Sequence, residues 1–577
     1  MSACPPEGEP ALAGARAAHE AFDSYQTWFR IITRRAQMRF ENRDWHGMQS
    51  DASERLGLYR QVLDPLVTLI RRSLGPRIGE KSLWTAMKAV YSGLIEDRRD
   101  RELAETFFNS LTRRIFTTVG VDPEVEFVDS DFVHPPQPAD PPVFRAYRGN
   151  GNLAALSAAI LTDCGFQKEF ENLQRDAELA EQEISRRLRA AGLPSQPDRL
   201  EMIRSVFYRG KGAYVVGKVC SGEEELPLAF CLLNPDGGIV VDAVLMNEDE
   251  VSILFSFTRS YFHIHMDQAH ALVQFLKSIM PRKPVSELYN SVGCNKHGKT
   301  ELFRDLLRHL AATNDLFEAA PGARGMVMAV FTLPSFEVVF KIIKDSFDYP
   351  KKSTREEVME KYRLVFAHDR AGRLVDAQEF EHLQFDRARF SPPLLDELQK
   401  SAKETVIVNH DSVVIKHLYT ERRLTPLDVY LQAAGPEAIG AAVVDFGNAI
   451  KDLARANIFT GDVLAKNFGV TRHGRIVSYD YDELCLLTDC NFRDMPAARS
   501  MDEELADEPW FYVAENDYFP EEFESFFGLA GPWRALFRNH HADLFRTDFW
   551  QQIQRRIQAG ELIHIFPYPP DRRLAIP

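Results

Sequence analysis

The stretch that decides the fold is Asn457–Glu483, NIFTGDVLAKNFGVTRHGRIVSYDYDE, within a chain of 577 residues. In it Asn467 follows Asp462 by five positions, and Asp480 follows Asn467 by thirteen. A glycine separates two runs of β-forming residues, and the second run, Ile476–Tyr479, leads directly into Asp480. The stretch therefore predicts a loop that presents a carboxylate and an amide, followed by a hairpin that delivers a second carboxylate.

These side chains have the chemistry that phosphoryl transfer requires. The carboxylate of Asp462 can accept the proton of an attacking hydroxyl group. Asn467 and Asp480 offer the hard oxygen ligands that Mg²⁺ prefers. Because the intervals match those of the HRDxxxxN loop and the metal-binding aspartate of protein kinases, the stretch resembles a kinase catalytic loop.

Features upstream of the loop would hold the phosphates of a nucleotide. Residues Ala320–Val327 match GxGxxGxV with alanine in place of the first glycine, and such a turn can lie over phosphates. Sixteen residues after Gly325, Lys341 falls on an alternating β-run like the VAIK strand and would neutralise the α- and β-phosphates. Val413–Tyr419 then predicts a strand that leads to a hinge for adenine. Since these parts arrive in the kinase order, we expect a bilobal protein-kinase-like domain at 314–577.

Some positions depart from the protein-kinase pattern. Thr460 and Gly461 replace the histidine and arginine of HRD, and Lys466 lies four residues after the catalytic aspartate. The DFG triplet has become DYD, which adds a second carboxylate at Asp482. The glutamate that would pair with the strand lysine stays open between Glu360 and two upstream glutamates. No activation segment with an APE ending can be read.

The first 313 residues predict a mostly helical regulatory domain with a small β element. Apolar residues recur at three- and four-residue steps from Ala11 to about Thr118. A Pro-rich passage breaks this pattern near 131–144, and β-rich runs occupy about 203–246. The fold class is therefore α+β in two domains, 1–313 and 314–577.

Gly293–Thr300, GCNKHGKT, fits the P-loop pattern GxxxxGK[ST]. A P-loop needs a buried strand before it and a helix after it, so that backbone N–H groups converge on phosphates. The preceding segment, KPVSELYNSVG, instead has helical spacing. We therefore interpret this match as a turn between two helices.

The composition bounds the function. A net charge of −15 argues against nucleic-acid binding. The N-terminus lacks the pattern of a signal peptide, and the most apolar stretch, Gly325–Ile343, is interrupted by charges and a proline, so we expect no membrane span. Seven scattered cysteines indicate neither a disulfide framework nor a zinc site, which fits a reducing cytoplasm.

Stretches along nearly the whole chain resemble the bacterial isocitrate dehydrogenase kinase/phosphatase family, among them ELYNSVGCNKHGKTE, EAAPGARGMVMAVFTLPSFEVVFKIIKD and HADLFR. The resemblance implies Mg-ATP-dependent phosphorylation of a serine of isocitrate dehydrogenase, its reversal, and ATP hydrolysis. It also implies AMP as an effector and a switch between the tricarboxylic acid cycle and the glyoxylate bypass. Both activities would share one nucleotide site, with ATP or ADP and Mg²⁺ or Mn²⁺ as cofactors.

Carried over residue by residue, the resemblance places nucleotide binding at Ala320, Pro321, Gly322, Ala323, Arg324, Gly325, Met326 and Lys341. It implicates Asp376 in dephosphorylation. No separate phosphatase motif can be read, so dephosphorylation would borrow the kinase metal site at Asn467 and Asp480, with Asp376 or Asp482 positioning water or ADP. Asp462 and Lys466 complete the catalytic candidates.

The residues alone leave two alternative functions open. A pseudokinase-like nucleotide-binding scaffold would explain the missing HRD arginine, although the lysine, both aspartates and the asparagine are present. A small-molecule phosphotransferase with a kinase-like fold would also lack that arginine. The acidic segment Asp502–Glu524 is a candidate surface for docking isocitrate dehydrogenase, and a homodimer is left open.

Overall fold

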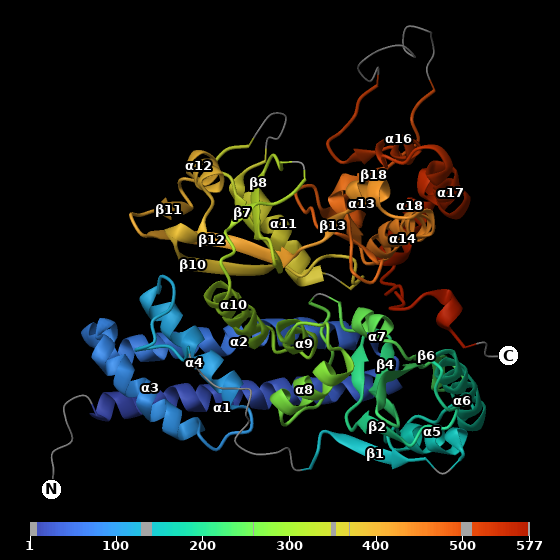
Figure 1. Ribbon diagram of the computed structural model, residues 1–577, viewed down its shortest axis with the longest axis horizontal. Helices are drawn as coiled ribbons and strands as arrows, with labels where there is room; N and C mark the ends of the chain where they lie inside the picture. Colours follow the sequence, from blue (N-terminus) through green and yellow to red (C-terminus); the bar gives the residue numbers. More distant parts are fainter. Residues whose placement is uncertain are drawn as a thin grey trace.

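The computed structural model describes residues 8–128, 141–149, 151–257, 259–322, 324–347, 353–368, 370–497 and 511–574. Figure 1 shows two layers: the lower one holds the segments before residue 314, and the upper one holds most of those after it. We refer to these parts as the N-terminal and C-terminal domains. Both contain helices and sheets, which confirms the predicted α+β class.

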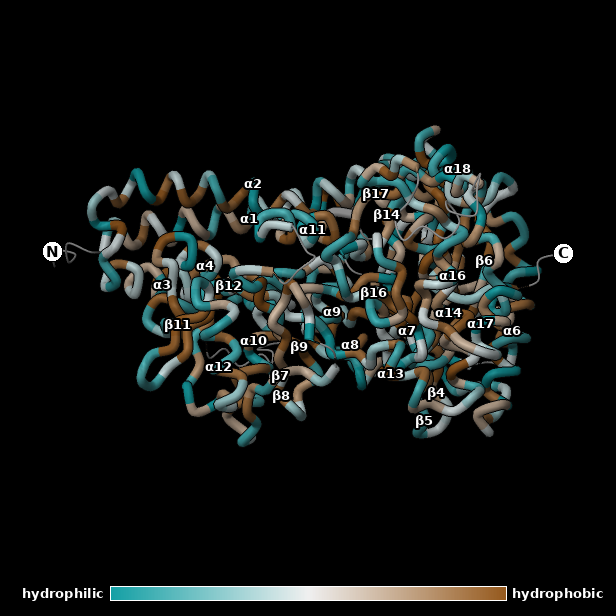
Figure 2. Tube along the Cα trace, turned by 90° about the horizontal axis from the view of Figure 1, so that it is seen from above, coloured by the Kyte–Doolittle hydropathy of each residue, from teal (hydrophilic) through white to brown (hydrophobic). Residues whose placement is uncertain are grey.

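Four helices open the N-terminal domain: α1 (Gly8–Glu41), α2 (Trp45–Leu74), α3 (Lys81–Ile95) and α4 (Arg101–Phe116), with a 3-10 turn at Gly75–Gly79. α1 and α2 lie side by side, and apolar and hydrophilic stretches alternate along them (Figure 2). On α1 the buried residues Ala11, Ala15, Ala18 and Phe22 recur at the period of one helix face. The helical prediction for this region is confirmed. No helix among the described residues has the length and apolarity needed to cross a bilayer.

A six-stranded antiparallel sheet follows. Its strands are β1 (Phe144–Arg148), β2 (Arg199–Ile203), β3 (Phe207–Arg209), β4 (Gly212–Ser221), β5 (Glu224–Leu233) and β6 (Val240–Leu245). Their order is β1-β2-β4-β5-β6, with β3 paired to β4. The predicted β region is confirmed, but the sheet begins earlier, because β1 emerges directly from the Pro-rich passage and pairs with β2. Helices α5 (Leu153–Thr162) and α6 (Leu173–Ala190) precede β2.

Helices α7 (Glu248–Leu254), α8 (Ala269–Ile279), α9 (Val285–Ser291) and α10 (Asn295–Ala312) complete the N-terminal domain. The P-loop look-alike begins in the turn between α9 and α10, at Gly293 and Cys294, and its remaining residues, 295–300, are the first residues of α10. Gly298 lies inside α10, where a Cβ atom would come within 2.5 Å of the Ser286 carbonyl oxygen. This glycine therefore permits close helix packing, and no strand delivers the loop. α10 lies between the two layers (Figure 1), and its Leu306 and Leu310 join the core of the C-terminal domain's sheet.

The first lobe of the C-terminal domain is a six-stranded sheet. It contains β7 (Glu318–Ala319), β8 (Met328–Leu333), β9 (Phe336–Ile343), β10 (Gln378–Asp386), β11 (Val406–Val408) and β12 (Ser412–Arg422). The order is β10-β12-β9-β8-β7, with β11 paired to β12. Helices α11 (Arg355–His368) and α12 (Pro392–Ser401) belong to the same lobe. The strands predicted around Lys341 and at Val413–Tyr419 are thus neighbours in one sheet.

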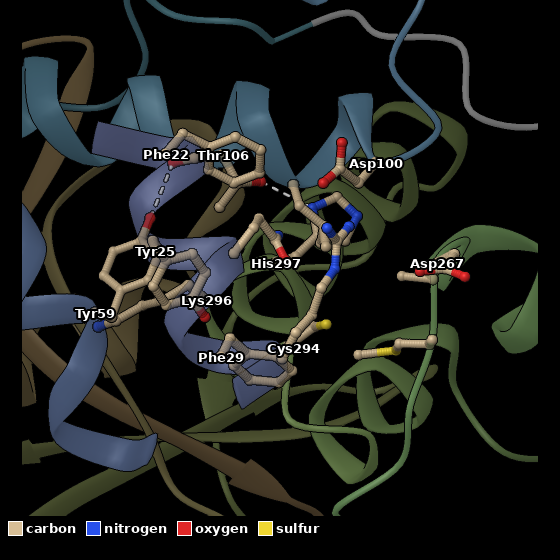
Figure 3. A pocket seen from close by; sticks show the side chains of 15 residues that line it. Phe22, Tyr25, Phe29, Tyr59, Asp100, Thr106, Asp267, Cys294, Lys296 and His297 are labelled. Carbon is tan, nitrogen blue, oxygen red and sulfur yellow. Dashed lines mark hydrogen bonds between the residues drawn. The ribbon is translucent and has the colours of Figure 1, made fainter. Parts of the chain in front are cut away.

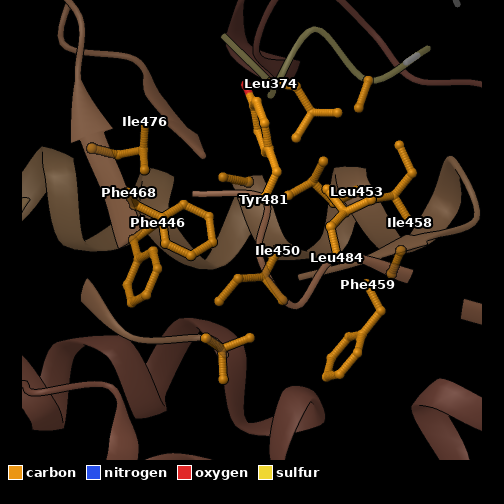
Figure 4. Packing of buried hydrophobic residues seen from close by; sticks show 14 of the residues in the cluster. Leu374, Phe446, Ile450, Leu453, Ile458, Phe459, Phe468, Ile476, Tyr481 and Leu484 are labelled. Carbon is orange, nitrogen blue, oxygen red and sulfur yellow. The ribbon is translucent and has the colours of Figure 1, made fainter. Parts of the chain in front are cut away.

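The second lobe is mainly helical. Its helices are α13 (Leu427–Ala433), α14 (Pro436–Arg455), α16 (Phe523–Phe526), α17 (Gly531–His541) and α18 (Thr547–Gln558). Its short strands are β13 (Thr425–Pro426), β14 (Ile458–Phe459), β15 (Phe468–Val470), β16 (Ile476–Ser478), β17 (Cys485–Leu486), β18 (Asn491–Phe492) and β19 (Asp517–Tyr518). Figure 4 shows Phe446 and Ile450 of α14 packed near Phe468 and Ile476 of the β15–β16 hairpin. The Phe446 and Phe468 rings are 4.9 Å apart at their centroids, so this core fixes the hairpin that carries Asp480.

The chain returns to the N-terminal domain after α18. Arg573 forms a bidentate ion pair with Asp242 of β6, with nitrogen–oxygen distances of 2.8–3.0 Å. The hydroxyl group of Tyr568 donates to the same carboxylate, and the amide of Leu574 donates to the Asp242 carbonyl. We call residues 568–574 the C-terminal strap, because they fasten the last part of the chain to β6.

Candidate active site

Lys341 lies in the middle of the first-lobe sheet, where β9 pairs with β8 on one side and with β12 on the other. Its ammonium group donates to the carbonyl oxygen of Tyr479 at 2.7 Å and lies 2.8 Å from the Glu421 carboxylate. Tyr479 immediately precedes Asp480, so the first contact joins the two lobes at the predicted metal ligand. The structure thus brings the strand lysine and the DYD aspartate together.

The partner of Lys341 is Glu421 of β12, which is not one of the glutamates predicted from the sequence. The three predicted glutamates, all on α11, are exposed. α11 instead presents Tyr362, whose hydroxyl group donates to Glu421 at 3.3 Å and whose ring stacks on Tyr419 at 3.9 Å. Burial raises the pKa of Glu421, while the adjacent Lys341 opposes that shift. A strand neighbour therefore takes the place that the αC glutamate has in protein kinases.

The glycine turn joins β7 to β8, which pair antiparallel. The amide of Ala320 donates to the Val330 carbonyl at 3.0 Å, and Lys344 donates to the Gly325 carbonyl at 2.8 Å. Gly322 has φ +116°, a backbone conformation that favours glycine. Pro321, Gly322, Arg324 and Gly325 are exposed and Met326 is half-buried, whereas Ala323 lies outside the described residues. The turn is therefore tied to the first-lobe sheet at Ala320 and at Gly325.

The catalytic loop lies between β14 and a 3-10 turn at Ala465–Asn467. Gly461 has φ +70°, and a Cβ atom there would lie 2.5 Å from the Glu483 side chain. An arginine at this position, as in HRD, would have no room beside Glu483. The departure from the kinase pattern therefore has a local steric cause. Asp462 and Lys466 are both exposed.

Asn467 and Asp480 sit at the same end of the β15–β16 hairpin. The amide of Tyr479 donates to the Asn467 carbonyl at 3.2 Å, which continues the strand pairing toward the site. Asn467 is buried and Asp480 is half-buried. The backbone amide of Asp482 lies 3.4 Å from an Asp480 carboxylate oxygen, so the DYD triplet turns back toward its first carboxylate.

These oxygen donors fit a magnesium ion. Among the described residues no group of three or more histidine, cysteine, aspartate or glutamate side chains is placed to hold a metal ion by itself. An amide and a carboxylate on adjacent segments suit an ion that shares its remaining coordination with phosphate oxygens and water.

Asp376 lies elsewhere, in the wall of a cavity of about 450 Å³ between the two domains. Its carboxylate accepts hydrogen bonds from Asn290 at 3.0 Å and Gln378 at 2.8 Å, and Arg259 lies 3.6 Å away. Withdrawal from water raises the pKa of this carboxyl group, although Arg259 opposes the shift. The residues lining the cavity include Glu421, the partner of Lys341, but not Lys341, Asp462, Asn467 or Asp480. Asp376 therefore shares a cavity with the partner of Lys341 and lies apart from the other site residues predicted from the sequence.

A backbone path still links Asp376 to the kinase cluster. The amide of Val375 donates to the Ser478 carbonyl at 3.1 Å, and the hydroxyl group of Tyr481 donates to the Val375 carbonyl at 2.7 Å. The residue beside Asp376 thus contacts both the strand before Asp480 and the residue after it.

A smaller cavity lies inside the N-terminal domain. Figure 3 shows Tyr25, Tyr59, Cys294 and His297 around it, with the Thr106 hydroxyl 2.8 Å from the His297 ring. Its volume of about 30 Å³ suits a buried water and excludes a nucleotide. Of the acidic segment Asp502–Glu524, residues 502–510 lie outside the described residues, and the docking role stays a prediction.

The first lobe supplies a glycine turn and a strand lysine, and the second supplies the loop that carries Asp462 and the hairpin that carries Asp480. Together they define the C-terminal domain as the catalytic domain of a protein-kinase-like enzyme. Residues 315–570 match the family model described as isocitrate dehydrogenase kinase/phosphatase (AceK) kinase domain, and residues 15–314 match the corresponding regulatory domain. The chain therefore belongs to the isocitrate dehydrogenase kinase/phosphatase family.

Curated relatives agree along the full length. The isocitrate dehydrogenase kinase/phosphatase of Anaeromyxobacter sp. (strain Fw109-5) is 49% identical over 565 residues, which cover 98% of each chain. That of Anaeromyxobacter dehalogenans (strain 2CP-C) is 47% identical, again over 98% of each chain. That of Acidovorax sp. (strain JS42) is 42% identical over 97% of this chain and 95% of the relative. The resemblance predicted from the sequence is confirmed.

Proposed function

We propose that this chain transfers the γ-phosphoryl group of ATP to a serine hydroxyl group of isocitrate dehydrogenase, and that it also removes that phosphoryl group. The observation that carries the proposal is the contact of Lys341 with the Tyr479 carbonyl, because it holds a phosphate-binding cation beside Asp480. The substrate is supported by family membership, since the relatives are named for isocitrate dehydrogenase.

Each residue has a distinct task in the proposed transfer. Residues 320–326 cover the nucleotide, and Lys341 orients its phosphates. Asp462 accepts the proton of the serine hydroxyl group as the phosphoryl group departs from ADP. Lys466 provides positive charge beside that aspartate. Asn467 and Asp480 would hold Mg²⁺ or Mn²⁺, which supplies charge neutralisation when bound.

Dephosphorylation and ATP hydrolysis are proposed to use the same site. The sequence offers one set of phosphate-handling residues, and Asp482 stands next to Asp480 where it can orient a water molecule. Asp376 would act on this reaction from the interdomain cavity, through the Val375 contacts with Ser478 and Tyr481. Asp376 would therefore act as a positioning residue and not as a catalytic one.

We propose that AMP acts as an effector in the interdomain cavity. A volume of about 450 Å³ is sufficient for a mononucleotide. Arg422, His473 and Arg475 line the cavity and can face a phosphate group, and Arg422 follows Glu421 on β12. Occupation of the cavity would thus act on the strand that holds Lys341. The result would be a switch of flux between the tricarboxylic acid cycle and the glyoxylate bypass.

The proposed division of labour assigns regulation to residues 1–313 and catalysis to residues 314–577, in a cytoplasmic protein. The test is incubation of the full chain with isocitrate dehydrogenase and γ-labelled ATP, followed by removal of ATP and addition of ADP. Label should enter a serine of isocitrate dehydrogenase and then leave it. A chain that binds ATP yet labels no isocitrate dehydrogenase would contradict the proposal and favour the pseudokinase scaffold.

A further inference from the structure

Two cysteines meet just beyond the DYD triplet. Cys485 lies on β17, and Cys490 follows the 3-10 turn at Leu487–Asp489. Their sulfur atoms are 3.5 Å apart. A disulfide bond has a sulfur–sulfur distance of about 2.0 Å, so the two side chains need to approach by roughly 1.5 Å. The other four described cysteines all lie in the N-terminal domain, which leaves this pair as the thiols of the C-terminal domain.

The surroundings of the pair favour reaction at Cys485. Cys485 is half-buried, whereas Cys490 is only 7% exposed, so an oxidant reaches Cys485 first. The hydrogen bond between the two thiols lowers the pKa of the Cys485 thiol, and Lys361 of α11 and Tyr518 act in the same direction, while burial opposes the shift. The same contact and burial raise the pKa of the Cys490 thiol. Cys485 is therefore the thiol that more readily becomes a nucleophilic thiolate.

We propose that Cys485 and Cys490 form a reversible disulfide bond in response to hydrogen peroxide, and that this bond slows phosphoryl transfer. The Cys485 thiolate attacks a peroxide oxygen; a sulfur–oxygen bond forms, the oxygen–oxygen bond breaks, and hydroxide leaves and is protonated to water. The Cys490 thiolate then attacks the Cys485 sulfur, the sulfur–sulfur bond forms, and a second hydroxide leaves as water. Two thiols and one peroxide give one disulfide and two waters, with two electrons passing from sulfur to peroxide.

The pair is mechanically connected to the catalytic loop. Cys485 pairs with Phe459 across β14 and β17, and β14 leads directly into the loop. Glu483, two residues before Cys485, packs closely on Gly461 of the loop. A Cβ atom added to Gly461 would lie 2.5 Å from the Glu483 side chain. Gln554 of α18 donates to the carbonyls of Leu487 and Cys490, which holds the turn in place. Because the turn is held, closing the bond draws Cys485 and Glu483 toward it and shifts the loop that carries Asp462.

A displacement of this kind has a measurable cost. Misplacement of a catalytic group by about 1 Å can lower a rate by up to about 100-fold. The shift at Asp462 is smaller than the shift at sulfur, so we expect an approximately tenfold loss of transfer rate on oxidation. The activity part of this inference rests on the proposed kinase function, whereas formation of the bond does not.

The test treats the full chain with increasing hydrogen peroxide and then alkylates the remaining thiols. Cleavage after arginine and lysine places both cysteines on one peptide, residues 476–493, so the bond appears as a loss of two hydrogens from that peptide. Phosphorylation of isocitrate dehydrogenase is measured in parallel, before and after dithiothreitol. Cys490→Ser is the test variant, and Cys164→Ser, which removes a half-buried thiol of the N-terminal domain, is the matched control.

The expected result is an internally linked peptide, a tenfold slower transfer, and recovery of both with dithiothreitol. Cys490→Ser should keep its rate under peroxide, and Cys164→Ser should respond like the wild type. Oxidation of Cys485 to sulfinic acid without the link would overturn the proposal. A complete link with an unchanged rate would overturn the regulatory part, and absence of phosphorylation even in the reduced protein would instead count against the proposed kinase function.

Discussion

The ammonium group of Lys341 lies 2.8 Å from the carboxylate of Glu421, and the two residues stand on neighbouring strands, β9 and β12. A protein kinase normally takes this glutamate from a helix, whose movement makes and breaks the pair. A pair formed inside one sheet is less free to separate. We therefore expect regulation of the enzyme to act on the first-lobe sheet and on the face of that sheet toward the N-terminal domain.

Glu421→Gln should raise the KM for ATP and lower the transfer rate about tenfold, because Lys341 loses the charge that orients it. Glu360→Gln is the matched control, since this glutamate of α11 is exposed and should leave both constants unchanged. Steady-state kinetics with varied ATP measures the two effects. A larger loss of transfer rate in Glu360→Gln than in Glu421→Gln would show that α11 supplies the partner of Lys341.

Asp462→Asn should retain ATP binding and lower phosphorylation of isocitrate dehydrogenase by about two to four orders of magnitude, because the variant has no carboxylate to accept the hydroxyl proton. Nucleotide affinity is measured by calorimetry and turnover by transfer of label. Turnover near that of the wild type would remove Asp462 from the base role.

Lys341→Met and Asp480→Ala should each abolish both phosphorylation and dephosphorylation, because one site is proposed to serve both directions. Asp376→Ala should harm dephosphorylation several-fold more than phosphorylation, since its carboxylate is held by Asn290 and Gln378 and the protein-kinase template requires no carboxylate there. Both rates are measured on proteins matched by thermal melting. A Lys341→Met protein with the wild-type dephosphorylation rate would point to a separate phosphatase site.

Lys299→Ala should leave ATP affinity unchanged within about threefold. This lysine occupies the lysine position of the P-loop pattern, but it lies inside α10 and stands 4.8 Å from the centre of the Phe380 ring. A cation over an aromatic ring in a domain interface supports packing more than ligand binding. Loss of ATP binding in a protein that melts normally would show that the P-loop pattern is functional.

The interdomain pair of Glu287 and Arg422 should make the stability depend on pH. Although burial opposes the shift, Lys283 and Arg422 lower the pKa of Glu287 to about 2. The corresponding pKa in the unfolded chain is about 4.3. A depressed carboxyl pKa contributes stability that is fully present above about pH 4.3 and is lost as the pH falls toward 2.

Glu287→Gln should accordingly lower the free energy of unfolding by about 1–2 kcal/mol at pH 7, and the difference from the wild type should shrink below about pH 4. Glu337→Gln serves as the control, because Glu337 also approaches Arg422, at 3.4 Å, but its side chain is 73% exposed. Chemical denaturation across pH measures both variants. An undiminished difference at pH 3 would assign the effect to packing.

The spacing of Asp462, Asn467 and Asp480 made the second lobe predictable from sequence, because short intervals along one loop and hairpin fix local geometry. The recurrence of apolar residues at the helical period likewise made α1–α4 predictable from the sequence. Glu421 could not be found in this way. Its pairing with Lys341 depends on the register of two strands 80 residues apart, which sequence spacing does not encode.

The surroundings of Asp376 could not be predicted, for a related reason. The family resemblance implicates Asp376 in the phosphatase reaction, and two of the side chains that surround it, Asn290 and Arg259, come from the other domain. A contact between domains leaves no periodic signal in either segment. For Gly461, in contrast, the departure from HRD could be read from the sequence, and the structure explains it by the close approach of Glu483.

The C-terminal strap has a consequence for the synthesis of the chain. β6 is the edge strand of the N-terminal sheet, and the strap pairs with it through Ala243 and Arg573. Arg573 lies 331 residues after Asp242 in the sequence, so the N-terminal sheet leaves the ribosome long before the strap is available to cover the edge of β6. During that interval the nascent N-terminal domain exposes a strand edge, which is a template for pairing with other chains. Docking of the strap thus ends the period in which the newly made chain exposes this strand edge to aggregation.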